Sequence, residues 1–189
     1  MSFAVAAGTS TAFVGAEGSG KSAIAGCVLG EIRPEIGKVT VLGVDPRRER
    51  RALRRRLRHS EDVGELRLDT DPPTLLRFTV DPGRAAGADR IAFLEEGRLV
   101  LEDALPRLLS RFRRIRYVNE VTETRTDYGT ELDLFDAVRV KVRGWGVDAV
   151  VANFEDALFE RLRSTEGVRD ARADAMTLEE IFDAVAGGR

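Results

Sequence analysis

A short run of residues near the start of the chain carries the clearest chemical signal. Residues 15–22 read Gly-Ala-Glu-Gly-Ser-Gly-Lys-Ser and match the pattern G-x-x-x-x-G-K-[ST] at each fixed position. Glycines let successive backbone N–H groups converge on phosphate oxygens, and the positive end of a following helix adds to the attraction. The pattern therefore predicts a binding site for nucleotide phosphate.

The residue types in this run assign individual roles. Lys21 supplies a positive charge for the β and γ phosphates, and Ser22 offers its hydroxyl to Mg²⁺. Glu17 is at a variable position, from which its negative charge can oppose phosphate binding. The predicted phosphate-binding residues are Gly15, Gly18, Ser19, Gly20, Lys21, Ser22 and Ala23, and Ser22 is also the predicted metal ligand. The alternative is a glycine-rich turn that carries a surface lysine.

The elements on either side of the run suit this role. Residues 10–14 read as a short buried strand, and residues 21–29 are rich in helix formers, so the loop joins a strand to a helix as the mechanism requires. The residues that follow predict an α/β core. Its further elements are strands near 2–6, 38–42, 89–94 and 98–102 and helices near 47–57 and 104–112. Residues 60–87 mix prolines and glycines with short apolar runs, which indicates a compressed connection.

The remainder of the chain predicts a smaller α/β module. Its expected elements are a strand at 113–121, a loop at 122–129, a hairpin of 137–142 with 147–152, a helix at 155–164, a strand at 168–173 and a helix at 177–186. Trp145 lies at the hairpin tip, as either a partner contact or a packed turn residue. We therefore expect two domains, a nucleotide-binding core over residues 1–112 and an accessory module over residues 113–189.

Composition narrows the function classes. The 189-residue chain has a formal net charge of −2, one Cys and one His, so it can form no internal disulfide and offers no zinc cluster or Cys-His nucleophile. Apolar stretches are too short for a membrane span, which makes the cytoplasm the expected location. The arginine-rich run at 47–58 has an apolar stripe at helical spacing and no interleaved aromatics, so it indicates a solvated helix face and no nucleic-acid partner.

The order of these features resembles the ATP-binding subunit of an ABC transporter. Residues 2–8 look like the strand and turn before the family's phosphate loop, and residues 29–46 look like its following helix, turn and strand. Residues 88–102 are similar to the late hairpin, and residues 176–182 look like the last helix of drug-export members. The resemblance covers roughly residues 1–60, 85–112 and 155–187, and implies a shortened P-loop NTPase-like core with a C-terminal addition that serves regulation or subunit contact.

Several of the family's catalytic parts are missing. The sequence has no Leu-Ser-Gly-Gly-Gln signature and no helical subdomain to carry it. The strand that normally ends in Asp-Glu has its nearest candidate at residues 65–72, with Thr70 in the place of Glu; alternatively, residues 60–62 are the segment that normally carries a glutamine contact to magnesium. Val80 takes the place of the catalytic histidine. The resemblance therefore implies a degenerate ATPase with weak or absent hydrolysis.

Two function classes follow. The first is an ATP-binding subunit that uses ATP and Mg²⁺ and acts with a membrane-embedded transporter subunit or a complete ABC ATPase, in the cytoplasm or peripherally at the inner face of the cell membrane, with an oligomer as one arrangement. The second is a non-catalytic scaffold that retains the fold without productive ATP binding. A third reading, an unrelated phosphoryl-transfer enzyme, needs acidic magnesium ligands, for which Asp69 and Asp71 are the candidates.

Overall fold

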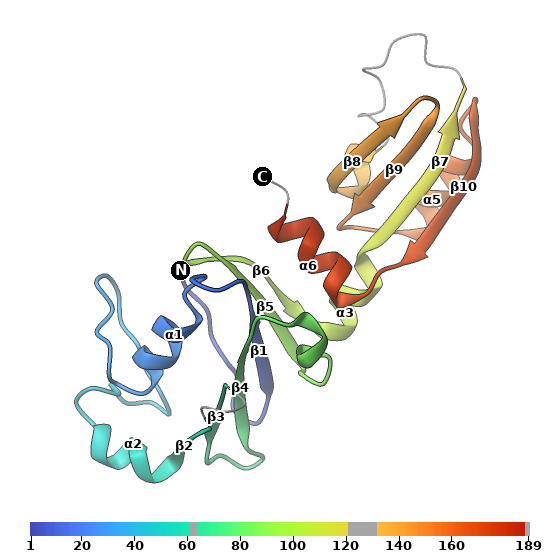
Figure 1. Cartoon of the computed structure of the whole chain (residues 1–189). Helices are drawn as coiled ribbons and strands as arrows, with labels where there is room; N and C mark the ends of the chain where they lie inside the picture. The colour runs from blue at the N-terminus through green and yellow to red at the C-terminus, as the bar shows by residue number, and fades with distance from the viewer. Residues whose placement is uncertain (61–63, 121–131, 188–189) are drawn as a thin grey trace. The chain divides into compact units, whose positions relative to one another are not determined.

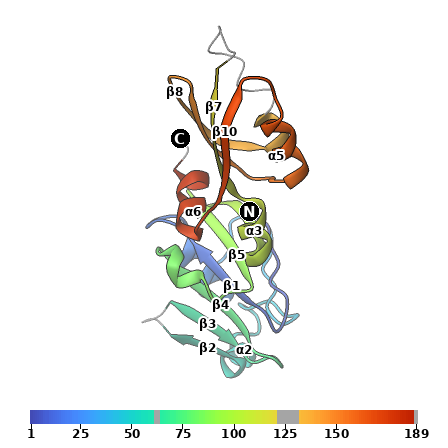
Figure 2. The same cartoon turned by 90° about the vertical axis from the view of Figure 1, so that its right-hand side faces the viewer.

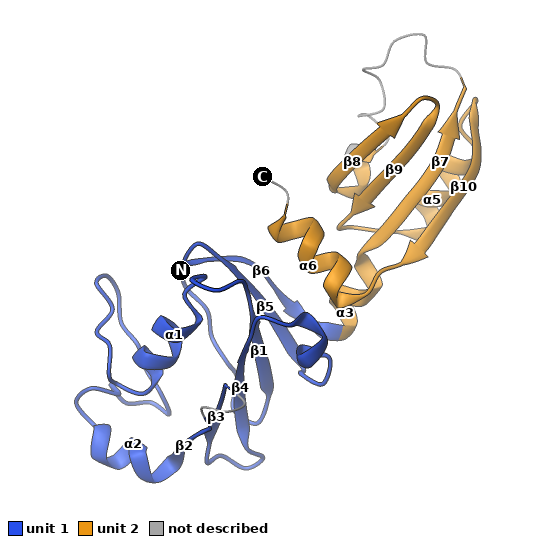
Figure 3. Ribbon diagram, in the orientation of Figure 1, with its two compact units in different colours: residues 1–105 blue, residues 106–189 orange. Residues whose placement is uncertain are grey.

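The computed structural model describes residues 1–60, 64–120 and 132–187 and divides the chain into two compact units. Unit 1 spans Met1–Leu105 and unit 2 spans Pro106–Arg189 (Figure 3). Both units combine helices with a sheet, so the α/β class predicted from the sequence is correct. The domain boundary expected after residue 112 stays a prediction. Among the described residues, the helices lack the combination of length and apolarity that crossing a bilayer requires.

Unit 1 is built on a six-stranded mixed sheet with the order β2-β3-β4-β1-β5-β6 (Figure 1). In chain order its elements are β1 (Ser10–Val14), α1 (Lys21–Val28), α2 (Arg50–Arg56), β2 (Leu57–Ser60), β3 (Glu65–Leu68), β4 (Thr74–Thr79), the 3-10 helix η1 (Pro82–Ala85), β5 (Arg90–Glu95) and β6 (Arg98–Ala104). β1 pairs in parallel with β4 and β5, and the remaining neighbours pair antiparallel. The strand that precedes the glycine-rich loop is therefore in the middle of the sheet.

The burial of β1 explains its central place. Ala12, Phe13 and Val14 are fully buried, as expected for a parallel strand covered on both faces. The ring of Phe13 stacks on Phe78 with 5.2 Å between centroids and meets the edge of Phe3 at 5.1 Å. On the same face, α1 and α2 close the core with three apolar side chains, Ile24, Val28 and Leu53.

Two predicted strands of unit 1 are wrong, because neither segment finds a strand partner. Residues 2–6 form no strand, although Phe3 and Val5 still pack against the core. Residues 38–42 are interrupted by a tight turn, in which Leu42 and Gly43 both have positive φ and Val41 forms a bridge with Val44. The predicted compressed connection at 60–87 contains β3 and β4, so it is part of the sheet.

Unit 2 is a four-stranded antiparallel sheet with the order β10-β7-β9-β8. Its elements are α3 (Leu105–Arg111, which begins at the last residue of unit 1), β7 (Arg113–Asn119), the 3-10 helix η2 (Asp133–Phe135), β8 (Ala137–Arg143), β9 (Gly146–Val151), α5 (Asp156–Arg163), β10 (Val168–Ala175) and α6 (Leu178–Ala186). α5 packs on one face of the sheet (Figure 2), and Leu162 joins Ile115, Ala149 and Val151 in a buried core. The predicted hairpin, the two helices and the strand between them are confirmed, whereas the predicted loop at 122–129 lies outside the described residues.

Candidate phosphate-binding site

The glycine-rich loop leaves the sheet where three parallel strands end together. Val14 is in register with Thr79 of β4 and Phe93 of β5, and the Gly15 N–H donates to the Thr79 carbonyl at 3.2 Å. We call this the loop edge of the sheet. Crevices outside the carboxyl ends of parallel strands are where ligands bind in open α/β sheets.

The glycines of the loop serve different purposes. A Cβ at Gly15 would lie 2.4 Å from the Leu94 carbonyl oxygen and 2.5 Å from the Ser19 hydroxyl, so only glycine fits there without movement. Gly18 and Gly20 have φ of 76° and 102°, in the left-handed region that favours glycine. Glycine is therefore favoured at Gly15 because a side chain has no space there, and at Gly18 and Gly20 because of the backbone conformation.

The tip of the β5–β6 hairpin contacts the loop, although it lies far from the loop in the sequence. The Gly97 N–H donates to the carbonyl of Ser19 at 3.1 Å, and Ser19 is buried. Glu96 and Gly97 both have positive φ, which makes the turn tight enough to approach the loop. Sequence reasoning found this turn but missed its contact with the loop, since nothing in the spacing of the two segments indicates it.

The side chain of Lys21 folds back onto the glycine-rich loop. Its Nζ donates to the carbonyls of Gly15 and Ala16, each at 2.7 Å, and to Ser19 Oγ at 3.2 Å. Partial burial lowers the pKa of the Lys21 ammonium from its ordinary value, and the negative charge of Glu17 opposes this shift. The ammonium group is thus positioned at the loop by oxygen atoms that a phosphate could replace as partners.

The start of α1 suits an anion. Gly20 caps the helix without a side-chain hydrogen bond, and the first turn contains no acidic residue. The first intrahelical bond joins the N–H of Ile24 to the carbonyl of Gly20, so helix geometry leaves the preceding N–H groups, at Lys21, Ser22 and Ala23, without intrahelical acceptors. Ser22 and Ala23 are exposed. The residues present therefore fit the phosphates of a nucleotide, with the Ser22 hydroxyl available to Mg²⁺.

The two acidic candidates for a second magnesium contact lie at the wrong edge of the sheet. β3 runs antiparallel to β4, and its last residue, Leu68, pairs with Thr74 at the start of β4. Asp69 and Asp71 consequently follow β3 at the edge opposite the loop, where Thr70 bonds to Thr74 Oγ1 at 2.7 Å. Of the other alternative, residues 60–62, only Ser60 is described; it ends β2 at the loop edge.

No proton-transferring side chain occupies the end of β4. Val80 directly follows this strand and is 55% exposed at the loop edge. Asp81 comes next, but its carboxylate accepts the N–H of Gly83 at 2.8 Å and caps η1. Val80 cannot polarise a water molecule, so this position supplies no general base.

The remaining sequence candidates have structural roles or are exposed. The arginine-rich run forms α2, which buries Leu53 and leaves its arginines in solvent, with Arg50 paired to Glu31 at 3.3 Å. Cys27 is partly buried on α1 and His59 is exposed on β2. Within residues 1–60, 64–120 and 132–187, no three His, Cys, Asp or Glu side chains group as metal ligands.

Together, the mixed sheet and its glycine-rich loop define an α/β protein with a candidate phosphate-binding loop. Residues 1–74 match the family model described as ABC transporter, and the match ends at the first residue of β4. The match covers the first 74 of the 189 residues and supports the resemblance of this part of the chain to an ABC transporter nucleotide-binding domain in shortened form. The match supports ATP binding of the ABC type, typically with Mg²⁺. None of the curated proteins matches this chain.

Proposed function

We propose that this chain is an ATP-binding subunit that hydrolyses ATP weakly or not at all on its own and responds to nucleotide through partners. The observation that carries the proposal is the position of Lys21, whose ammonium group lies at the loop beside the start of α1, which has no side-chain cap. The proposed contacts are the backbone N–H groups from Gly18 to Ala23 and the Lys21 ammonium for phosphate, and the Ser22 hydroxyl for Mg²⁺.

The proposal of weak hydrolysis rests on the loop edge. The antiparallel direction of β3 takes Asp69 and Asp71 away from the loop, and Val80 offers no base. Loss of one positioned base typically costs about 10²- to 10⁴-fold in rate. Turnover therefore requires groups from a second protein, for which a complete ABC ATPase is the proposed source and a membrane-embedded transporter subunit the proposed target. A cytoplasmic position at the inner face of the membrane follows from that partnership.

The first experiment is an equilibrium titration of the full chain with Mg-ATP, in parallel with Lys21→Ala and Lys38→Ala. Lys38 is an exposed lysine of the same unit and serves as the matched control. We expect saturable binding of Mg-ATP. Lys21→Ala should weaken the affinity by about tenfold or more, which corresponds to at least about 1.4 kcal/mol, whereas Lys38→Ala should change it by less than about twofold. Phosphate release by the isolated chain at rates typical of ATPases, abolished in Lys21→Ala, would contradict the proposal of weak hydrolysis.

A non-catalytic scaffold is the second candidate function, and one observation favours it. The three oxygen partners of Lys21 all belong to the loop itself, so the loop is internally bonded without any nucleotide. Absence of binding at millimolar Mg-ATP, by a sample with a cooperative unfolding transition, would select this function.

A further inference from the structure

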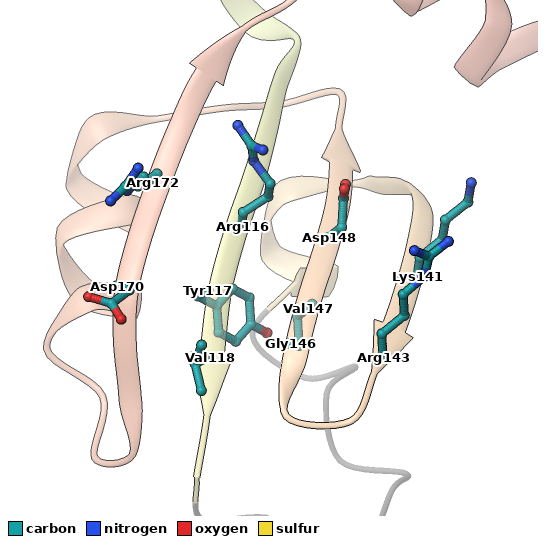
Figure 4. Close-up of a pocket in the computed structure, with 10 residues that line it drawn as sticks. All are labelled: Arg116, Tyr117, Val118, Lys141, Arg143, Gly146, Val147, Asp148, Asp170 and Arg172. Atoms are coloured by element: carbon teal, nitrogen blue, oxygen red, sulfur yellow. The ribbon is translucent and has the colours of Figure 1, made fainter.

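The face of the unit 2 sheet opposite α5 carries a row of charged side chains across all four strands. Arg172 of β10 pairs in register with Arg116 of β7, Arg116 with Asp148 of β9, and Asp148 with Lys141 of β8. Residues directly opposite each other on neighbouring strands point to the same face. Three cations and one carboxylate therefore share one line that crosses the strands (Figure 4).

The next row supplies another cation and open space. Val118 pairs with Gly146, and Gly146 pairs with Arg143. Because glycine has no side chain, the sheet surface is low at this point, between Val118 and Arg143. The two rows line a hollow of about 590 Å³, within the range of small-molecule sites. Asp170, within the irregular part of β10, also lines it.

The carboxylates on this face neutralise only part of its positive charge. Asp174 already pairs with Arg116, and Asp148 lies 3.8 Å from Arg114. Lys141 and Arg143 form no ion pair or hydrogen bond with any side chain in the described part of unit 2. Arg172 interacts electrostatically with Asp174, which is shared with Arg116. Positive charge from both outer strands thus faces the hollow.

The ends of the hollow limit how long a ligand can be. At one end, α6 covers the adjacent row, where Glu180 pairs with Arg114 at 3.4 Å and the Asp183 carbonyl accepts from Arg139. At the other end, Glu120 pairs with Arg169 at 2.8 Å. An acidic chain running along the strands would meet these carboxylates. The positive charge is confined to a strip across the strands, roughly 14 Å wide from three strand spacings.

We propose that this face binds a small soluble polyanion with two or more phosphate groups. Several cations at separate positions suit charges distributed along an oligophosphate better than a single phosphate. A base-stacking nucleic acid does not suit the face, because the aromatic residue among the described lining, Tyr117, is only 4% exposed. The site is separate from the glycine-rich loop and does not depend on the proposed ATP binding.

The test is a titration of the full chain with inorganic tripolyphosphate, carried out in a Lys21→Ala background so that the loop does not contribute. The double variant Lys141→Gln/Arg143→Gln removes two cations of the hollow. The matched control Arg161→Gln/Arg163→Gln removes the same charge from α5, on the opposite side of the sheet. We expect saturable binding that the first pair weakens by about tenfold or more and the control by less than about twofold.

A second measurement locates the bound ligand directly, through the backbone amides that line the hollow. Tripolyphosphate should shift the backbone amide resonances of Gly146 and Arg116 in the Lys21→Ala chain, and Arg172→Gln should weaken binding from the other outer strand. ATP added to the same background tests whether a nucleotide supplies the oligophosphate, and equal affinity for both ligands would support recognition through phosphate alone. Any of three results would overturn the proposal. They are the absence of saturable binding at millimolar tripolyphosphate, an equal loss of affinity in both double variants, and equally tight binding of a hexaglutamate peptide.

Discussion

At the scale of single residues, substitutions of two loop glycines distinguish a steric clash from an unfavourable backbone conformation. Gly15→Ala places a Cβ 2.4 Å from the Leu94 carbonyl oxygen, whereas Gly18→Ala points into open space and pays only for its φ of 76°. We expect Gly18→Ala to lower the free energy of unfolding by about 1–2 kcal/mol. Gly15→Ala should cost more, about 3 kcal/mol, because the backbone must shift. Equilibrium urea unfolding of both variants measures this difference, and equal losses would contradict it.

The carboxylate of Asp89, which contacts the first residue of β1, predicts that the free energy of unfolding depends on pH. Asp89 accepts the N–H and the hydroxyl of Ser10, each at 2.8 Å, and these bonds hold the pKa of Asp89 below its ordinary value. A lowered folded-state pKa adds stability above the unfolded-state pKa of about 3.9, and that stability is lost as pH falls through the folded-state pKa. Asp89→Asn should therefore destabilise unit 1 at pH 6, and the difference from wild type should shrink in acid.

The control for this prediction is Ser10→Ala, which removes the hydroxyl and keeps the backbone bond. We expect an intermediate pH dependence, since the backbone bond is the larger cause of the shift. Urea unfolding at several pH values measures all three proteins. A gap between wild type and Asp89→Asn that does not change with pH would show that Asp89 has the same pKa in both states.

The place of the loop between a strand and a helix was predictable from the sequence, and the phosphate contacts of its residues stay a prediction. Gly15, Lys21 and Ser22 match a pattern whose physics is local. The partner of Ser19 was not predictable, since the Gly97 N–H comes from a turn far along the chain. The internal partners of Lys21 were likewise not evident, because carbonyl directions depend on the conformation of the loop.

At the scale of elements, the cap of α6 gives a measurable prediction. Thr177 Oγ1 accepts the N–H of Glu180 at 3.2 Å, and the Glu180 carboxylate accepts the N–H of Thr177 at 2.9 Å. Thr177→Ala should destabilise α6 by about 1 kcal/mol, while Thr177→Ser keeps the hydroxyl and serves as the control. Amide hydrogen exchange along α6 reports the change. Equal protection in Thr177→Ala and wild type would mean that packing alone holds the helix end.

The direction of β3 shows where prediction of elements from sequence fails. The short run Glu-Leu-Arg-Leu is compatible with a strand of either direction. The turns decide it: Gly64 has φ of 59°, and a Cβ there would lie 2.5 Å from the Phe78 carbonyl oxygen. The hairpin in unit 2 was predictable because long alternating strands flank a Gly-Trp-Gly turn.

At the scale of the whole molecule, the contacts of α3 predict where unit 2 begins. The Arg111 carbonyl accepts the N–H of Phe154 at 2.9 Å, and its guanidinium donates to the Ala152 carbonyl at 3.1 Å. A fragment of residues 106–189 should thus be more stable than one of residues 113–189, by about 1–3 kcal/mol for the two bonds. Urea unfolding of both fragments measures the difference, and equal stability would favour the boundary expected from the sequence.

Each unit has its own apolar core. The boundary expected after residue 112 stays a prediction, since α3 reads as a helix that either part could own. Its hydrogen bonds, which the sequence does not encode locally, tie its end to unit 2.

The central place of β1 has a consequence for biosynthesis. β1 leaves the ribosome well before its two neighbours in the sheet, which begin only at Thr74 and Arg90. Bringing such distant segments together carries a loop-closure cost that local hairpins avoid. The nascent chain consequently carries a glycine-rich loop without a sheet to hold it until β5 has been translated. We expect the emerging polypeptide to be unable to capture nucleotide through most of the synthesis of unit 1.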